Sequence, residues 1–131
     1  MLGQFQQTNI RIEIEATEAA IRKSLLNVAQ LKQWMLPSGF SQGLPDELTE
    51  GTTFTRWIGP IAVCHYVQSV EANTLELLLS QGIDGFHRWH WGDGWIQSCL
   101  EGVSPLPLGL GHTISLLSLK RYLTNQAVLK S

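Results

Sequence analysis

The fold of this chain is decided between residues 61 and 103, which read IAVCHYVQSVEANTLELLLSQGIDGFHRWHWGDGWIQSCLEGV. Apolar and polar residues alternate in several parts of this stretch, which predicts strands with one buried and one exposed face. Short turn sequences separate these parts, and the clearest is Asp93-Gly94, because glycine tolerates the positive φ of a tight hairpin. We expect an antiparallel meander of four strands, over residues 61–70, 74–80, 85–92 and 95–103.

A further strand and a long loop precede this meander. Residues 52–58 predict the strand, and Gly59-Pro60 ends it. Residues 37–51 contain three glycines and two prolines and predict a loop. Because long loops often border binding sites, we expect this one to lie at the edge of a site.

The first part of the chain predicts one strand followed by two short helices. Apolar and charged residues alternate strictly over residues 9–16, which indicates a half-buried strand. Thr17 is a candidate N-cap, and the charge of Glu18 favours a helix N-terminus. Apolar residues then follow helical spacing, with an interruption at Asn27, until Pro37 ends the second helix.

The last segment predicts a helix over about residues 108–125, with an apolar face and with Lys120 and Arg121 late, where positive charge favours the helix dipole. The order of elements is therefore β-α-α-β-β-β-β-β-α. A sheet of about six strands cannot bury its apolar face alone, so the last helix must cover it, with the two short helices at the edge. We predict an α+β fold in a single domain over residues 1–131.

Composition and charge exclude several classes of protein. The chain has 131 residues, 44% of them hydrophobic, and a formal net charge of −2 with scattered basic residues, so we expect no nucleic-acid partner. We expect neither a signal peptide nor a membrane-spanning helix. Cys64 and Cys99 lack CxxC spacing, so we expect both to be buried and reduced. These features predict a cytoplasmic protein.

Several short motifs along the chain carry a family resemblance. They are the isoleucine strand that leads into Thr17, the segment LNVAQLKQW at residues 26–34, Gly51 followed by Phe54, and the pairs Tyr66-Val67 and Val70-Glu71. Together with the order of elements, they resemble the START-like helix-grip superfamily, also called the SRPBCC or polyketide cyclase/dehydrase group. That group typically has seven strands and a longer final helix, so the six strands expected here suggest a smaller cavity.

The resemblance covers nearly the whole chain and implies a cavity between a curved sheet and the C-terminal helix. Members of the group bind lipids, sterols, polyketides or other apolar molecules there, and some catalyse cyclisation or hydrolysis. Our leading hypothesis is therefore the binding or transport of a small hydrophobic ligand. The residues expected to line or gate the site are Trp34, Trp57, His65, His87, Trp89, Trp91, Leu116 and Leu119.

Residues 86–95 are the stretch richest in candidate site residues. On a strand, His87, Trp89 and Trp91 share one face, where they either line a pocket or fill the core. His87 and His90 point to opposite faces and cannot share an ion, so we expect no metal site. No GxSxG, HExxH, P-loop or GxGxxG motif occurs, and we expect no cofactor.

Two alternatives to a binding protein stay open. An enzyme of the cyclase/dehydrase or hydrolase type would use a cavity histidine, and the candidates are His65 and His87. A protein-interaction module without a small ligand would instead expose aromatic residues such as Trp95 or Trp34. A homodimer is compatible with all three hypotheses.

Two arginines on strands bear on the chemistry of a ligand. If Arg56 or Arg88 pointed into the cavity, it could pair with a ligand carboxylate. Charged side chains also commonly protect the outer face of a sheet. We therefore expect both arginines on the outer face.

Overall fold

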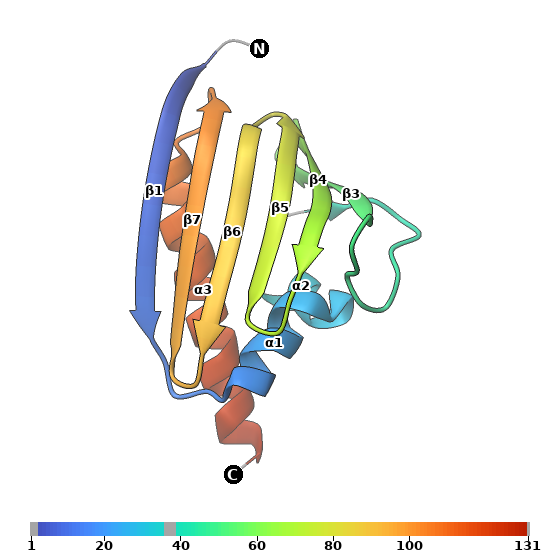
Figure 1. The fold of residues 1–131 in the computed structure, drawn as a ribbon. Coiled ribbons are helices and arrows are strands. Elements are labelled where there is room, and N and C mark those ends of the chain that lie inside the picture. Colours follow the sequence, from blue (N-terminus) through green and yellow to red (C-terminus); the bar gives the residue numbers. More distant parts are fainter. Residues whose placement is uncertain (1–2, 36–38, 131) are drawn as a thin grey trace.

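A computed structural model describes residues 3–35 and 39–130. It contains a seven-stranded antiparallel sheet with the spatial order β1-β7-β6-β5-β4-β3-β2, and three helices that cover one face of it (Figure 1). The strands are β1 Gln4–Glu13, β2 Gly39–Phe40, β3 Thr53–Ile58, β4 Ile61–Val70, β5 Thr74–Gln81, β6 Asp84–Gly92 and β7 Trp95–Ser104. The helices are α1 Glu18–Leu26, α2 Val28–Trp34 and α3 Leu108–Lys130.

The first strand pairs with the last one. β1 runs antiparallel to β7 along its whole length, from Gln4 opposite Ser104 to Glu13 opposite Trp95. The β6–β7 hairpin turns at Gly94, whose φ of 83° is a conformation that glycine adopts without strain. The backbone of Gly94 also exchanges hydrogen bonds with Ile14 and Ala16, so the hairpin holds the end of β1.

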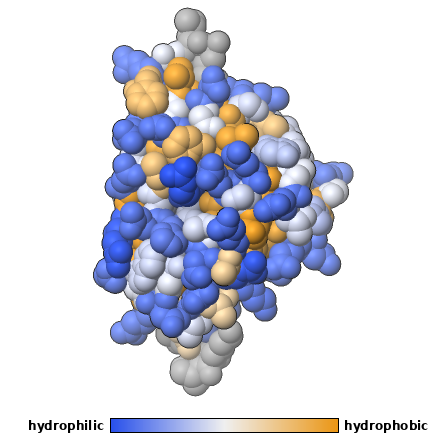
Figure 2. Space-filling model, in the orientation of Figure 1, coloured by the Kyte–Doolittle hydropathy of each residue, from blue (hydrophilic) through white to orange (hydrophobic). Residues whose placement is uncertain are grey.

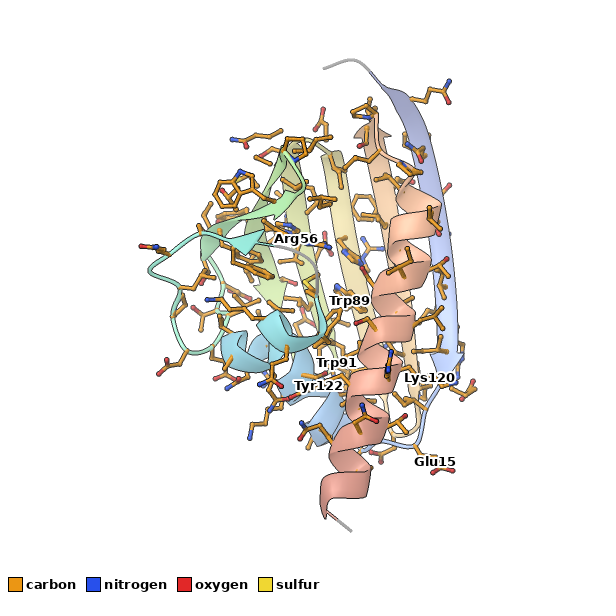
Figure 3. All side chains as sticks on the ribbon, turned by 180° about the vertical axis from the view of Figure 1, so that it is seen from behind. Glu15, Arg56, Trp89, Trp91, Lys120 and Tyr122 are labelled. Atoms are coloured by element: carbon orange, nitrogen blue, oxygen red, sulfur yellow. The ribbon has the colours of Figure 1, made fainter. Side chains whose placement is uncertain are left out.

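The inner face of the sheet is apolar and is covered by the helices. α3 packs against β1 and β7, and α1 and α2 contact α3 at one end of the sheet (Figures 1 and 3). Figure 2 shows the outer face of the sheet, where hydrophilic residues predominate and apolar side chains are scattered between them. The alternation read from β4, β5 and β6 is confirmed, because Val63, Val67, Leu75, Leu77, Leu79, Trp89 and Trp91 are all buried.

Local hydrogen bonds set the two short helices against the sheet. Thr17 Oγ1 accepts from the backbone N–H of Ala20 at 3.1 Å, which confirms it as the N-cap of α1. Asp93 of the hairpin accepts the backbone N–H of Glu18 at 2.7 Å. At the end of α2, the Trp34 indole donates to the carbonyl of Ser24 at 2.8 Å, and its ring meets Trp89 edge to face at 5.9 Å.

The structure differs from the expected elements in the number of strands, the end of the last helix and the start of the first strand. The strand count is seven rather than six, because Gly39–Phe40, inside the expected loop, pairs with β3 as a strand too short to show any periodicity. α3 continues to Lys130 rather than ending near residue 125, so the final helix is not short. The predicted end of the second helix at Pro37 lies outside the described residues.

The first strand also begins earlier than expected, at Gln4 rather than at residue 9. Residues 4–8 show no apolar alternation, because their inward side chains include Gln6 and Thr8, which hydrogen-bond to the start of α3 and to the connection before it. A strand whose inner face is polar for a structural reason does not show the usual apolar pattern.

Buried and exposed leucines of α3 give a direct test of this arrangement. Leu119 is fully buried against the sheet, whereas Leu117 is 59% exposed. We expect Leu119→Ala to lower the free energy of unfolding by about 2–5 kcal/mol, because it leaves a cavity in the core. Leu117→Ala is the matched control and is expected to change it by less than about 0.5 kcal/mol. Urea denaturation monitored by tryptophan fluorescence measures both, and equal effects would contradict the packing described.

Candidate functional site

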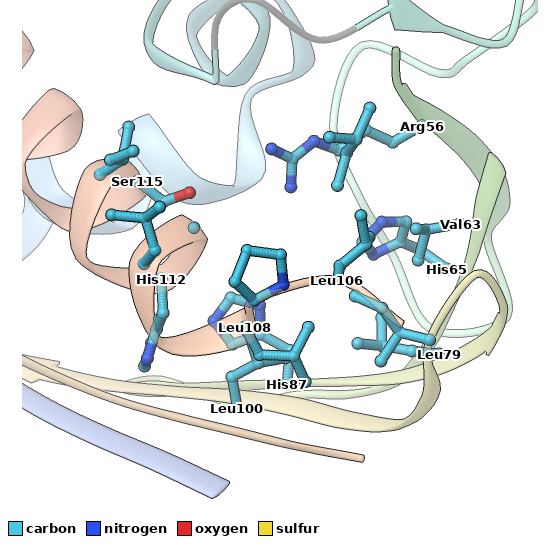
Figure 4. A pocket seen from close by; sticks show the side chains of 16 residues that line it. Arg56, Val63, His65, Leu79, His87, Leu100, Leu106, Leu108, His112 and Ser115 are labelled. Carbon is cyan, nitrogen blue, oxygen red and sulfur yellow. The ribbon is translucent and has the colours of Figure 1, made fainter. Parts of the chain in front are cut away.

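A cavity of about 180 Å³ lies between the inner face of the sheet and the first turns of α3 (Figure 4). It occupies the end of the sheet opposite to α1 and α2, near the β3–β4 and β5–β6 turns. Most of its wall is apolar and comes from Ile58, Val63, Leu79, Ile83, Leu100, Leu106, Pro107, Leu108, Leu110 and Ile114. Leu110 and Ile114 are 61% and 51% exposed, so the cavity reaches the surface beside α3.

The side chain of Gln6 fixes where α3 begins above this cavity. Its amide nitrogen donates to the carbonyls of Ser104 and Leu106, at 3.1 and 2.7 Å. Its amide oxygen accepts the backbone N–H of Leu108, the first residue of α3, at 2.9 Å. An orphan N–H of the helix N-terminus is thereby satisfied by a side chain from the neighbouring strand.

Arg56 of β3 points into the cavity (Figure 4). The expectation that this arginine lies on the outer face is therefore wrong. The period of two would have placed it inward, because Arg56 shares a face with Phe54, which is buried. Burial lowers the pKa of the Arg56 guanidinium to about 10, so it still carries its charge at neutral pH. Arg88 does lie on the outer face, where it is paired with Glu76 at 3.3 Å.

His65 of β4 lines the cavity with a ring that is only 3% exposed. It stacks on Phe54 at a centroid distance of 4.7 Å with the planes 2° apart. Neither ring nitrogen has a hydrogen-bond partner among the described residues. Burial, and secondarily the charge of Arg56, lower the pKa of His65 to about 3. The ring is thus neutral at pH 7, and its hydrogen-bonding capacity is not used by any residue that the structure describes.

A series of hydrogen bonds runs along the sheet on the side of the cavity opposite Arg56 and His65. Ser98 Oγ lies 2.8 Å from His87 Nε2 and 2.9 Å from His112 Nε2, so one serine bridges two histidines. His112 Nδ1 lies 3.2 Å from Thr8 Oγ1. Because the Ser98 hydroxyl has one proton, it can donate to only one of the two rings, so at least one of the two Nε2 atoms carries a proton and donates to Ser98.

Burial keeps both His87 and His112 in the neutral form. Burial lowers the pKa of His87 well below its usual value, with smaller contributions from the nearby His112, His65 and Arg56. Burial also lowers the pKa of His112 to about 4. At neutral pH these rings offer hydrogen bonds and not positive charge.

Among the residues predicted from sequence to form the site, the structure brings only His65 and His87 to the cavity wall. Trp34 and Trp89 border, together with His65, a void of about 10 Å³, which is at the lower limit of what a water molecule needs. Trp91, Leu116 and Leu119 lie in the hydrophobic core, and Trp57 is 40% exposed. Figure 3 shows Trp89 and Trp91 between the sheet and the helices.

Sequence reasoning missed His112 and Ser98. The ring of His112 lies against that of His87, with centroids 5.3 Å apart. The pairing depends on where α3 crosses the sheet, which no local pattern encodes. For Ser98 the alternation of β7 was a usable signal, since Ser98 shares its buried face with Ile96 and Leu100.

Other features of the described residues differ from this cavity. A more open depression at the opposite end of α3 has as its polar wall Glu13, Glu15, Lys120 and Thr124, which are all exposed (Figure 3). Over residues 3–35 and 39–130 there is no cluster of three or more His, Cys, Asp or Glu side chains that could hold a metal ion. Cys64 and Cys99 are free and half-buried rather than fully buried. The cavity with buried polar groups is therefore the candidate site.

Comparison by sequence gives no relative. No family model matches the chain, and no curated protein is similar to it.

Comparison by structure gives clear neighbours. An AHSA1-like protein from Aeromonas hydrophila superposes with a TM-score of 0.71 at 16% identity, over 93% of this chain and 94% of that one. The Aha1 dimer from Colwellia psychrerythraea gives 0.64 at 16% identity, over 90% and 96%. DynU16 of the dynemicin biosynthetic locus gives 0.66 at 17% identity, over 90% of this chain but 47% of that chain, so this chain spans about half of its length.

These neighbours share the fold of this chain at identities too low to transfer a function. The resemblance predicted from the sequence is confirmed at the level of the fold. The chain shares its fold with these solved structures, and an antiparallel sheet packed against a long C-terminal helix is the helix-grip arrangement that the resemblance implied.

Proposed function

We propose that this protein binds a small, mainly apolar ligand in the cavity between the sheet and the start of α3. The observation that carries the proposal is the cavity itself, with apolar walls and a few convergent polar groups, which is the usual composition of a small-molecule site. Its volume of about 180 Å³ is below the roughly 300–1,000 Å³ of pockets for drug-sized molecules. The expected ligand is therefore small.

The unused hydrogen-bonding capacity of His65 supports a ligand more strongly than the volume does. Buried polar side-chain atoms almost always have a partner, and leaving one without a partner costs about 1–3 kcal/mol. Both ring nitrogens of His65 lack one among the described residues, while the ring lines the cavity. A bound molecule with a polar group would supply the missing hydrogen bond.

The electrostatics of the histidines favour binding over acid–base catalysis. An efficient general base has a pKa near the working pH. The pKa of His65 is lowered to about 3 and that of His112 to about 4, and His87 is shifted in the same direction. At pH 7 these rings are weak bases, so a cyclase/dehydrase or hydrolase that uses His65 or His87 is the less favoured alternative.

An interaction module has less support than a binding protein. Trp34, one of the aromatic residues expected to be exposed, is 1% exposed, and Trp95 is half-buried. Leu110, Ile114 and Leu117 do form an exposed apolar stripe on α3. The structural neighbour from Colwellia psychrerythraea is described as a dimer, and a homodimer of this chain stays a prediction.

Two general expectations are part of the same proposal. Over the described residues no helix combines the length and the apolar character needed to cross a bilayer. Action as a single domain over residues 1–131 and a cytoplasmic location stay predictions.

Two glycines of α3 allow the cavity to be blocked without disturbing the backbone. Gly111 lines the cavity and Gly109 does not, and a Cβ added at either position meets nothing within 4 Å. We expect Gly111→Phe to weaken binding of 1-octanol at least about tenfold, which corresponds to 1.4 kcal/mol, because the ring occupies the cavity. Gly109→Phe is the matched control and should bind like the wild type.

The readout is a ¹H–¹⁵N NMR titration of each protein with 1-octanol. Saturable shifts at lining residues of β4, β6 and α3 are expected in the wild type and in Gly109→Phe. Absence of saturable shifts in the wild type, or equal affinity of the two variants, would contradict the proposed site.

The neutral state of His65 predicts how stability depends on pH. The unfolded chain takes up this proton near pH 6.5, whereas the folded protein does so only near pH 3. The contribution of neutral His65 to the free energy of unfolding is therefore fully present above about pH 6.5 and is lost as the pH falls towards 3. We expect His65→Gln to reduce the slope of unfolding free energy against pH, between pH 6 and 4.5, by about 1.4 kcal/mol per pH unit.

His90→Gln is the control, because His90 is exposed on the outer face against Trp95. Urea denaturation at several pH values measures the slope for each protein. Identical slopes for the wild type and His65→Gln would show that His65 is not buried as described.

A further inference from the structure

We propose that the ligand is a small carboxylic acid, bound as its anion with the carboxylate between Arg56 and His65 and the apolar part against the start of α3. This inference rests on the proposed ligand-binding function and names the chemical class of the ligand.

The charges of the cavity wall point to an anion. Arg56 carries a positive charge in the wall of the cavity. None of the described residues that line the cavity is an aspartate or a glutamate. The three histidines of the wall are neutral at pH 7, because burial lowers the pKa of each. The charge carried by the described lining residues is thus positive at neutral pH, and an anionic ligand complements it.

The position of Arg56 fits a carboxylate better than other polar groups. A guanidinium presents parallel N–H donors that match the two oxygens of a carboxylate, and such pairs are strongest where water is excluded. In Figure 4 Arg56 and His65 come from the same wall, and the guanidinium of Arg56 extends from β3 towards the middle of the cavity.

His65 supplies the second contact from the neighbouring strand. In the β3–β4 register Phe54 lies opposite His65, and Arg56 lies opposite Val63. Arg56 and His65 are therefore diagonal neighbours on the inner face, within reach of one carboxylate for side chains of this length. The neutral ring carries one N–H, and neither ring nitrogen is hydrogen-bonded among the described residues, so that N–H can donate to a ligand oxygen.

The opposite wall fits the apolar part of such an acid. The Nε2 atoms of His87 and His112 are both hydrogen-bonded to Ser98, so those atoms need no ligand partner. Leu100, Leu108 and Ile114 form the apolar surface on that side. A short alkyl or aromatic group lying there would run towards the opening at α3, where Leu110 is exposed.

The test compares octanoate with 1-octanol, which has the same chain length and no charge. Isothermal titration at pH 7 and low salt is carried out on the wild type, Arg56→Gln and Arg88→Gln. We expect the wild type to bind octanoate at least about tenfold more tightly than 1-octanol. Arg56→Gln should lose this preference and still bind 1-octanol, whereas Arg88→Gln, altered on the outer face, should keep it.

Two further measurements keep the inference testable if Arg56→Gln does not fold. Arg56→Lys retains the positive charge and should retain a preference for octanoate. In the wild type, ¹⁵N signals of the His65 ring should shift on addition of octanoate, while those of the exposed His90 should not.

The outcomes separate this inference from the function on which it rests. Equal binding of both probes by the wild type, or an unchanged preference in Arg56→Gln, overturns the carboxylate assignment and leaves a neutral apolar ligand in place. Failure of the wild type to bind either probe overturns both proposals.

Discussion

The cavity depends on the hydrogen bonds that Gln6 makes to the start of α3. Without a polar side chain at this position of β1, the N–H of Leu108 and the carbonyls of Ser104 and Leu106 would have to find other partners. Gln6 satisfies them from the neighbouring strand and so sets the position at which α3 begins over the sheet. The helix is close to the sheet at Leu119, where the core is solid, and leaves room for a ligand near Gly111.

The inner face of the sheet is consequently divided into two parts with different properties. Towards α1 and α2, large aromatic residues such as Trp34 and Trp89 fill the space, and little volume is left between them. Towards the β3–β4 turn, the inward positions carry Arg56 and His65, and the space between them and α3 stays open. Under the proposed function, stability and binding belong to different ends of one sheet, and a bound ligand would satisfy buried polar atoms that a solid core would not tolerate.

The three buried histidines differ in what they leave available. His87 and His112 share Ser98, so the Nε2 atoms of both rings have a partner within the protein. His65 stacks on Phe54 and has no such partner among the described residues. Histidine thus joins a hydrogen-bonded network within the protein on one wall of the cavity, whereas on the other wall its ring nitrogens lack a partner among the described residues. Burial next to a guanidinium, rather than the residue type itself, keeps His65 neutral.

The sequence by itself determined the elements other than β2, their order and the buried faces of the central strands, because alternation, helical spacing and turn residues are local properties of the chain. It also placed His65 and His87 on inward faces. Only the tertiary structure decided that Trp89 and Trp91 fill the core and that the ring of His112 contacts that of His87. It also decided that β1 starts at Gln4. These depend on the line along which α3 crosses the sheet, which is set by contacts between residues about a hundred positions apart, such as Gln6 and Leu108. Periodicity tells which way a side chain points, but not whether another element or an open cavity faces it.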